Sequence, residues 1–289
     1  MTDSEHAGAL VLVGTPIGNL DDLSPRAIEA LRSVDVIAAE DTRRTRALLS
    51  HAGIAAGRRL RSVHADNETE AATRIVDEIH NGARVAVVTD AGMPGISDPG
   101  GALVRACLDA GLAVEAVPGP SAALTALVLS GLPTVRFVFE GFLPRKGRAR
   151  AERLAAIADE TRTTVVFEAP TRLRATLTDL ADAGGSDRAV AVARELTKVF
   201  EDVWRGTLAD AVTHAQSTEP RGEYVIVVGP AAARGPAGEV EVEDAIRAAL
   251  TDGRSARDAA AEVAAELGVP RRRAYAAATR LRASRPRAD

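Results

Sequence analysis

Short runs of apolar residues recur along the first half of the chain, separated by longer stretches in which apolar and polar residues mix. The runs occupy residues 9–14, 34–39, 84–89 and 113–117. Their apolar residues do not alternate with polar ones, which is typical of strands buried on both faces. Helices are predicted between them, at 25–32, 68–80, 100–110 and 121–130. This alternation of strands and helices predicts a parallel sheet covered on both faces.

A second set of strands and helices begins near residue 133, and all eight aromatic residues follow position 136. Strands are predicted at 136–142, 163–169, 188–195 and 223–229, and helices after residue 147 and at 171–181. Ala, Gly and Pro dominate 231–238, as in a linker, and three helices broken at 253 and 268–270 follow. We therefore expect an α/β fold with four parts: an N-terminal α/β domain at 1–132, a second α/β domain at 133–230, a linker at 231–238 and a small basic helical module at 239–289.

The composition is that of a folded chain in water. Of its 289 residues, 46% are hydrophobic and 26% are charged, which excludes a disordered chain, a collagen and a coiled coil. The longest nearly apolar stretch, 121–132, is shorter than the roughly 20 residues of a membrane helix. The first residues are acidic where a secretory signal has Lys or Arg, so we expect a cytoplasmic protein that does not enter a membrane.

Cysteine and histidine give no sign of a disulfide or a metal site. A single cysteine, Cys107, excludes an internal disulfide. The histidines show neither HExxH nor the Cys/His spacing of a zinc site. We therefore expect no bound metal.

Positive charge gathers in patches although the net charge is only −4. Six arginines and no acidic residue lie in 43–65, and seven arginines with one acidic residue follow position 267. Such clusters bind phosphates without reading sequence, and the alternative is a set of solvated helix faces. Tyr275 is either a stacking ring beside the last cluster or a core residue. The basic residues expected to contact phosphates of a polyanion are Arg43, Arg44, Arg46, Arg145, Lys146, Arg148, Arg150, Arg271, Arg272 and Arg273.

Three strands of the first half end in turns rich in Gly and Pro. The turns are GTPIGNL from Gly14, TDAGMPGISDPGG from Thr89 and PGPSA from Pro118. Ligands of open α/β sheets bind at the carboxyl ends of strands, where Gly lets backbone N–H groups approach them. The three loops therefore predict one ligand crevice. Within it, Asp90 either accepts hydrogen bonds from a ligand or caps a turn.

The usual signatures of three enzyme classes are missing. The chain contains no G-x-G-x-x-G between strand and helix and no G-x-x-x-x-G-K-[ST]. A dinucleotide dehydrogenase and a P-loop NTPase are therefore disfavoured. The absence of G-x-S-x-G likewise disfavours a serine hydrolase.

Seven longer motifs, taken in order, carry a resemblance to a known family. They begin with GTPIGNLDDLSPRAIEALRSVDVIAAEDTRRTRALL and VVTDAGMPGISDPGGALVRAC, and continue with VPGPSA, GFLPRKG, FEAPTRL, ARELTKVFE and GEYVIVVG. The chain resembles the tetrapyrrole methylase superfamily and, within it, the ribosomal RNA small subunit methyltransferase I family. That family uses S-adenosylmethionine to methylate a cytidine 2′-hydroxyl of 16S rRNA. The resemblance covers about residues 9–230, and VPRRRAYAAA is similar to the family's C-terminal end.

This resemblance implies two α/β domains with S-adenosylmethionine in the cleft between them. It also implies a homodimer that acts on 16S rRNA of the small ribosomal subunit. The first three loops and one segment of the second domain would hold the cofactor. The residues implied for cofactor binding are Pro16, Ile17, Asp90, Gly92, Met93, Ile96, Ser121, Ala122 and Ala169.

Methyl transfer to a ribose hydroxyl requires alignment of donor and acceptor and loss of the hydroxyl proton, and it needs no metal. A base, or a cation that stabilises the developing alkoxide, is expected. The candidate catalytic residues are Asp41, Lys146 and Lys198, and the base itself stays unassigned. Structural alternatives exist: Asp41 caps a helix, Lys146 holds a phosphate, and Glu195 near Lys198 pairs with Arg194.

Two other functions fit part of the pattern. A porphyrinoid methyltransferase of the same superfamily would act on a small tetrapyrrole and would have little use for arginine clusters. A non-catalytic RNA-binding ribosome assembly factor would keep the cleft without turnover. Methyl transfer to small ribosomal subunits separates the three functions, because only the first labels RNA.

Overall fold

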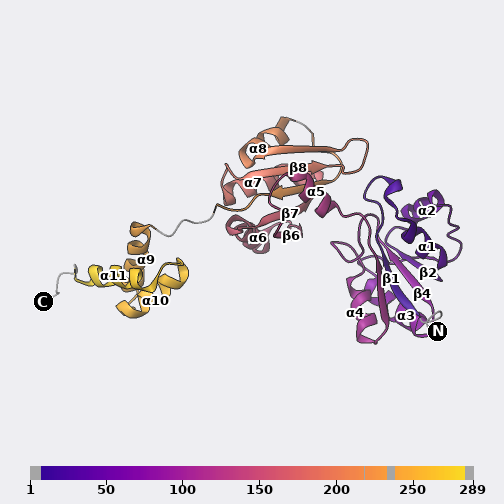
Figure 1. The fold of residues 1–289 in the computed structure, drawn as a ribbon, viewed down its shortest axis with the longest axis horizontal. Helices are drawn as coiled ribbons and strands as arrows, with labels where there is room; N and C mark the ends of the chain where they lie inside the picture. The colour runs from indigo at the N-terminus through magenta and orange to yellow at the C-terminus, as the bar shows by residue number, and fades with distance from the viewer. Residues whose placement is uncertain (1–7, 218, 233–237, 284–289) are drawn as a thin grey trace. The chain divides into compact units, whose positions relative to one another are not determined.

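The chain forms two compact units, one of residues 1–231 and one of residues 232–289 (Figure 1). The computed structural model describes residues 8–217, 219–232 and 238–283. The first unit contains two five-stranded sheets, and the second consists of helices. Within the described ranges, no helix is long and apolar enough to cross a bilayer.

The first sheet is parallel throughout, with the strand order β3-β2-β4-β1-β5. Its strands are β1 (Ala9–Val13), β2 (Val36–Ala39), β3 (Leu60–Ser62), β4 (Arg84–Val88) and β5 (Ala113–Val117). The predicted parallel sheet is confirmed. The sequence pattern missed the edge strand β3 because its three residues include only one apolar side chain.

Helices cover both faces of the first sheet. They are α1 (Pro25–Ser33), α2 (Thr42–His51), α3 (Glu68–His80) and α4 (Gly101–Asp109). On one face, Val11 and Val13 of β1 share a buried cluster with α1 and α2. On the other face, Leu10 of the same strand is buried with α3 and α4. Burial on both faces explains why the strand residues do not alternate between apolar and polar.

The second sheet is mixed, with the strand order β6-β7-β10-β8-β9. Its strands are β6 (Phe137–Phe142), β7 (Thr163–Glu168), β8 (Ala189–Arg194), β9 (Asp202–Thr207) and β10 (Tyr224–Val228). Strand β6 is parallel to β7, whereas β10 is antiparallel to both β7 and β8. One face packs against the helices α6 (Gly147–Asp159), α7 (Leu173–Gly184) and α8 (Leu208–Ser217).

The helix α5 (Ala122–Ser130) follows the last strand of the first sheet but packs on the second (Figure 1). Ala123 and Leu127 lie in one buried cluster with Val165 and Val227 of the second sheet. The domain expected at 1–132 includes this helix, whereas its packing groups it with the second sheet. The chain therefore passes from one sheet to the other in the loop 118–121.

The C-terminal unit contains three helices with a core of their own. They are α9 (Glu239–Thr251), α10 (Ala256–Glu266) and α11 (Arg271–Ala283), in agreement with the three predicted helices. Ile246 of α9, Val263 of α10 and Ala278 of α11 are buried together. The Ser255 side chain caps α10, and Gly268 at φ +61° turns the chain between α10 and α11.

Candidate active site

The loops after β1, β4 and β5 meet at the carboxyl ends of the strands of the first sheet. A Cβ added to Gly14 would lie 2.6 Å from the Cα of Gly119, so the two backbones approach as only glycines allow. Thr15 and Gly92 exchange two backbone hydrogen bonds, of 2.9 and 3.1 Å. The Thr15 hydroxyl also donates to the Thr89 carbonyl, 3.1 Å away. These contacts join the three loops into one edge, as the sequence predicts.

A cavity of about 430 Å³ opens beside these loops. This volume lies within the range of about 300–1,000 Å³ of small-molecule sites. The loops after β1 and β5 supply most of its lining, and Thr197 of the second sheet's β8–β9 connection completes it. The lining residues are Ile17, Asp22, Pro118, Gly119, Pro120, Thr125 and Thr197.

The first two loops bring several of the expected cofactor residues together. Pro16 and Ile17 are buried in the first loop. A Cβ added to Gly92 would lie 3.8 Å from Ile17 Cγ2, and the Met93 sulfur would lie 2.7 Å from a Cβ added to Gly14. Gly92 has a φ of +79°, which a side chain would strain.

The remaining cofactor candidates lie in separate segments of the fold. Ile96 is 51% exposed in the second loop. Ser121 caps α5 by accepting a hydrogen bond from the Leu124 N–H, and Ala122 begins that helix. Ala169 follows β7 of the second sheet. Of the nine candidates, all within the described ranges, only Ile17 lines the cavity.

The connection between β8 and β9 touches the first loop from the second sheet. The Asn19 N–H donates to the Thr197 hydroxyl at 3.0 Å, and a Cβ added to Gly18 would lie 2.5 Å from Lys198 Cγ. Glu195 and Thr197 have φ values of +50° and +64°. Left-handed backbone costs energy in such residues and clusters at functional sites. The second sheet therefore contributes a strained segment to the wall of the cavity.

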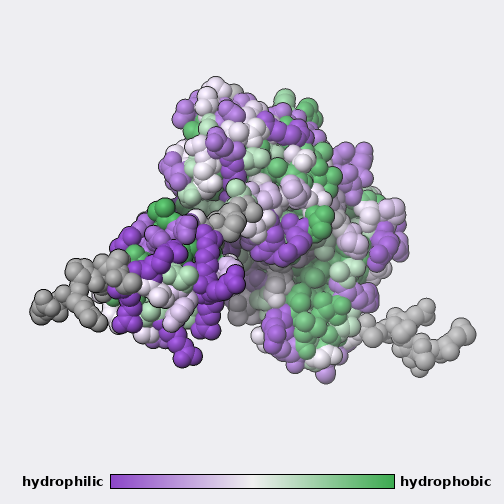
Figure 2. Space-filling model, turned by 60° about the vertical axis from the view of Figure 1, so that its left-hand side comes forward, coloured by the Kyte–Doolittle hydropathy of each residue, from purple (hydrophilic) through white to green (hydrophobic). Residues whose placement is uncertain are grey.

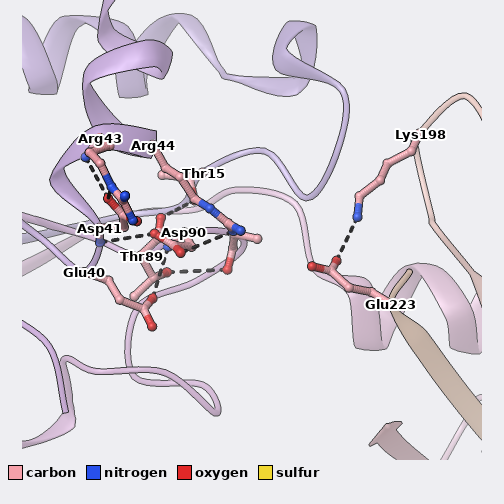
Figure 3. A network of polar contacts seen from close by, with 10 residues as sticks. Thr15, Glu40, Asp41, Arg43, Arg44, Thr89, Asp90, Lys198 and Glu223 are labelled. Carbon is pink, nitrogen blue, oxygen red and sulfur yellow. Dashed lines mark hydrogen bonds and ion pairs between the residues drawn. The ribbon is translucent and has the colours of Figure 1, made fainter. Parts of the chain in front are cut away.

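Carboxylates crowd the ends of the adjacent strands β2 and β4 (Figure 3). The Asp90 N–H donates to Glu40 Oε2, and the Asp41 N–H donates to Asp90 Oδ1, both at 3.2 Å. Burial, together with the charges of Glu40, Asp90 and Glu223, raises the pKa of Asp98 to about 6. No group of three or more His, Cys, Asp or Glu side chains in the described ranges has the arrangement of a metal site.

Asp41 caps α2 and binds Arg43 at the same time. Its Oδ1 accepts from the Arg43 N–H at 2.7 Å, and its Oδ2 lies 2.9 Å from the guanidinium. The hydrogen bonds with Arg43 lower the pKa of Asp41 to about 2, which makes its carboxylate a weak base. Arg44 pairs with Asp90 at 3.2 Å, and Arg46 is exposed on the same helix.

The two lysines have different surroundings. Lys198 Nζ lies 2.8 Å from Glu195 Oε1 and 3.0 Å from Glu223 Oε2. Burial lowers the pKa of Lys198, but its bonds to the two carboxylates outweigh burial and raise it overall. Lys146 is exposed beside Arg145 in the loop before α6, with no hydrogen bond to a described residue. Lys198 is therefore engaged in the fold, while Lys146 is free to meet a substrate.

Buried side chains hold the loop that carries Lys146. Arg172 donates to the Leu143 carbonyl at 2.8 Å, and Arg150 donates to the Pro144 carbonyl at 3.0 Å. Both arginines are joined through Glu168, whose side chain is fully buried. Its Oε1 lies 3.3 Å from Arg172 Nε, and its Oε2 accepts from the Thr176 hydroxyl, which in turn accepts from Arg150. The loop position thus depends on a network inside the second sheet's helices.

The same network corrects one expectation about RNA contact. Arg150 is 9% exposed, and its guanidinium binds Asp179 and Thr176, so it cannot face an RNA. Arg148 is exposed but pairs with Glu152 one turn along α6, at 2.6 Å. Arg145 and Lys146 remain the exposed cations of this loop.

Sequence reasoning missed several residues that shape the site. Asp22, Pro118, Pro120 and Thr125 line the cavity and were not singled out, because nothing in their local spacing marks them. Asp98 was missed although it stands in the glycine-rich second loop beside Pro99, where a carboxylate would be a reasonable candidate. Its proximity to Glu40 follows from strand pairing, which the sequence pattern does not reveal.

A family model matches most of the chain. The model for Tetrapyrrole (Corrin/Porphyrin) Methylases matches residues 9–212. A crystal structure of uroporphyrin-III C-methyltransferase from Thermus thermophilus, complexed with S-adenosyl homocysteine, is similar with a TM-score of 0.54 and 21% identity. The similarity covers 77% of this chain and 97% of the Thermus thermophilus chain. At this identity the likeness concerns the fold.

Curated relatives named Ribosomal RNA small subunit methyltransferase I are similar at much higher identity. The protein from Synechocystis is 44% identical over 278 residues, which is 96% of this chain and 99% of the relative. The protein from Thermotoga maritima is 45% identical over 221 residues, which is 76% of this chain but 98% of the relative. The Thermotoga protein is therefore shorter than this chain by about a fifth.

Proposed function

The chain belongs to the ribosomal RNA small subunit methyltransferase I family of the tetrapyrrole methylases, and on that premise we propose that it methylates a cytidine 2′-hydroxyl in 16S rRNA. It is a methyltransferase that uses S-adenosylmethionine. The proposal also includes a homodimer at work in the cytoplasm, with the small ribosomal subunit as its partner.

The observation that carries the proposal is the cavity where the loops after β1 and β5 meet Thr197. The close approach of Gly14 and Gly119 leaves backbone, rather than side chains, beside it, which suits a ligand that needs close contact. Of the cofactor residues named from the resemblance, Ile17 lines the cavity, and most of the others lie in the first two loops and at the start of α5. The residues present therefore fit S-adenosylmethionine.

The bound cofactor supplies a methyl group on a positively charged sulfur. The chain's part is to align the ribose hydroxyl with it and to assist the loss of the hydroxyl proton. We assign Lys146 to the RNA side, where its exposed ammonium stabilises the developing alkoxide or holds a neighbouring phosphate. Asp41 and Lys198, first considered for catalysis, take positioning roles here, because each is held in ion pairs.

The exposed arginines favour an RNA substrate over a small tetrapyrrole. Arg43 and Arg44 on α2 are 90% and 66% exposed even though each pairs with a carboxylate. Arg46 and Arg145 are exposed as well. We propose that these side chains contact phosphates of the rRNA, which a porphyrinoid substrate would not require.

The test is transfer of labelled methyl from S-adenosylmethionine to small subunits from a strain that lacks the protein. We expect one label per subunit, at a ribose 2′-oxygen of a cytidine, located by mass mapping of nuclease fragments. Label on a base would contradict the 2′-hydroxyl assignment. If a parallel reaction labels a tetrapyrrole while the subunits receive no label, the porphyrinoid enzyme is supported. Binding to subunits without label in either reaction would support an assembly factor.

A further inference from the structure

The last helix, α11, places polar residues on one side and small apolar residues on the other. Ala274, Ala277 and Ala278 are 2% exposed or less and face the core of the C-terminal unit. Helical spacing puts a second, contiguous set of residues on an adjacent, exposed side of the helix. We call this set the α11 face; its members, all exposed, are Arg271, Arg272, Tyr275, Thr279 and Arg282.

The arginines of this face have no ion-pair partner among the described residues of the unit. Within the described ranges, Arg271, Arg272 and Arg282 form no ion pair, whereas Arg280 beside them pairs with Glu239 and Glu243. Unpaired guanidinium groups on a rigid helix are available to an external anion.

Charge in this unit is polarised rather than generally basic. Residues 238–283 contain eight acidic and eight basic residues, and the last acidic one is Glu266. The basic module expected at 239–289 is therefore nearly neutral in this range, with its positive charge concentrated on α11. A polyanion would be attracted to α11 and repelled by the four acidic residues of α9.

The three arginines in the first turn of α11 destabilise this helix. Arg271, Arg272 and Arg273 stand at the end of α11 where the helix dipole is positive, and the first turn contains no acidic residue. Cations at this end destabilise a helix. Folding does not account for the cluster, so its reason lies outside the unit.

We propose that the α11 face binds double-stranded RNA, with its arginines on phosphates along both rims of one groove. This rests on the proposed function and deepens it, because it names the structural class of rRNA that the chain holds. Arg271 and Arg282 are eleven positions apart, which is about 16 Å along the helix. This distance is closer to the separation of phosphates across a groove than to that of neighbouring phosphates in one strand. Since A-form RNA has a narrow major groove, the helix lies over the wide, shallow minor groove.

The composition of the unit favours a duplex over a single strand. Proteins that bind single strands stack successive bases on several aromatic rings. The C-terminal unit has one aromatic residue, Tyr275, which is 52% exposed on the α11 face. Figure 2 shows that the presented surface of these helices is mostly hydrophilic, as a phosphate contact requires.

An accessory role agrees with the comparison to shorter relatives. The Thermotoga maritima protein has the same name as the longer relatives but a length close to that of residues 1–231 alone. On this comparison we assign the methylation chemistry to the first unit, and to the α11 face additional contact with the substrate.

The experiment compares two full-length triple variants for binding to a labelled RNA hairpin of about 16 base pairs. Arg271→Gln/Arg272→Gln/Arg282→Gln removes the α11 face. Arg247→Gln/Arg254→Gln/Arg257→Gln removes the same charge from α9, α10 and the turn between them and serves as the matched control. Binding is measured by anisotropy between 50 and 200 mM salt, and S-adenosylmethionine binding is measured by calorimetry in all three proteins.

We expect the α11 variant to bind the hairpin about tenfold or more weakly. The slope of log affinity against log salt concentration should become less steep by roughly two to three, because three phosphate contacts are lost. The control should keep most of the affinity and slope, and cofactor binding should not change in either variant. Tyr275→Ala should weaken hairpin binding several-fold.

Four results would overturn the proposal: equal affinity and slope in the α11 variant, tighter wild-type binding to a single strand of the same length, tighter binding to duplex DNA, or a change of oligomeric state alone. The proposed function fails separately, if subunits receive no methyl label while hairpin binding still depends on α11.

Discussion

Gly119 illustrates how one missing side chain shapes the site. A Cβ at this position would lie 2.7 Å from the Cα of Gly14, closer than real Cβ atoms approach backbone. Gly119→Ala should therefore push the loops after β1 and β5 apart and weaken S-adenosylmethionine binding at least tenfold in calorimetry. Gly101→Ala is the control, because a Cβ there meets nothing within 4 Å and the position has no positive φ. Equal affinity in the two variants would remove the Gly14–Gly119 contact from the site.

Lys146 is the residue on which the proposed mechanism depends most. Its side chain is exposed and forms no hydrogen bond or ion pair with a described residue, so Lys146→Ala should leave cofactor affinity and stability unchanged. Loss of alkoxide stabilisation should lower kcat/KM for subunit methylation, and the decrease should correspond to about 2–4 kcal/mol of lost transition-state stabilisation. Lys146→Arg should restore a phosphate contact better than an alkoxide contact, because the planar guanidinium needs more room. Wild-type turnover in the alanine variant would exclude both roles.

Asp98 should make the stability of the protein depend on pH. Its pKa rises from the ordinary 3.8 to about 6 through burial and through the charges of Glu40, Asp90 and Glu223. Between pH 6 and 4 the folded state therefore binds more protons than the unfolded state, and this group adds stability as the pH falls.

Asp98→Asn should raise the unfolding free energy at pH 7.5 by on the order of 1 kcal/mol, a value reduced by partial exposure of the carboxyl. The substitution should also remove part of the increase in unfolding free energy that the wild type shows when the pH falls from 7.5 to 5. Thermal unfolding of both proteins at the two pH values tests this. An Asn variant with the wild-type pH dependence would show that the repulsion among these carboxylates is relieved in solution.

At the scale of elements, Glu168 joins β7 to α6 and α7. Its carboxylate is fully buried, accepts a hydrogen bond from the Thr176 hydroxyl and forms an ion pair with Arg172. Glu168→Gln should lower the unfolding free energy by about 3 kcal/mol, because the neutral amide leaves Arg172 without its buried counter-charge. Urea unfolding measures the loss. Glu152→Gln, which removes the exposed partner of Arg148, should change stability by less than about 0.5 kcal/mol.

At the scale of the whole molecule, the separate core of α9, α10 and α11 predicts that the first unit folds without them. Truncation after Ala231 should leave cofactor binding and the unfolding transition of the first unit in place, while binding to small subunits becomes weaker and less dependent on salt. Calorimetry and subunit binding at several salt concentrations test this. A truncated protein that fails to fold, or binds subunits with wild-type affinity and salt dependence, would contradict the separation of roles.

Local patterns in the sequence were sufficient for much of the architecture. Uninterrupted apolar runs such as 9–14 and 84–89 indicated buried parallel strands, because a strand covered on both faces needs no polar side. Ser24 followed by Pro25 marked the start of α1, where the Ser24 hydroxyl accepts from the Ala27 N–H. Glycine-rich turns marked the ligand edge, since left-handed φ values and close backbone approach favour glycine.

Contacts between distant segments were decided only by the tertiary structure. The packing of α5 on the second sheet, the contact of Thr197 with Asn19 and the burial of Arg150 each depend on residues far apart in the chain. An exposed and a buried arginine have the same local sequence signature, because burial depends on which partners the fold brings within reach. The sequence by itself indicated the family, most of the strands and the glycine-rich loops, while the packing of the two sheets decided which charges stay free to meet a substrate.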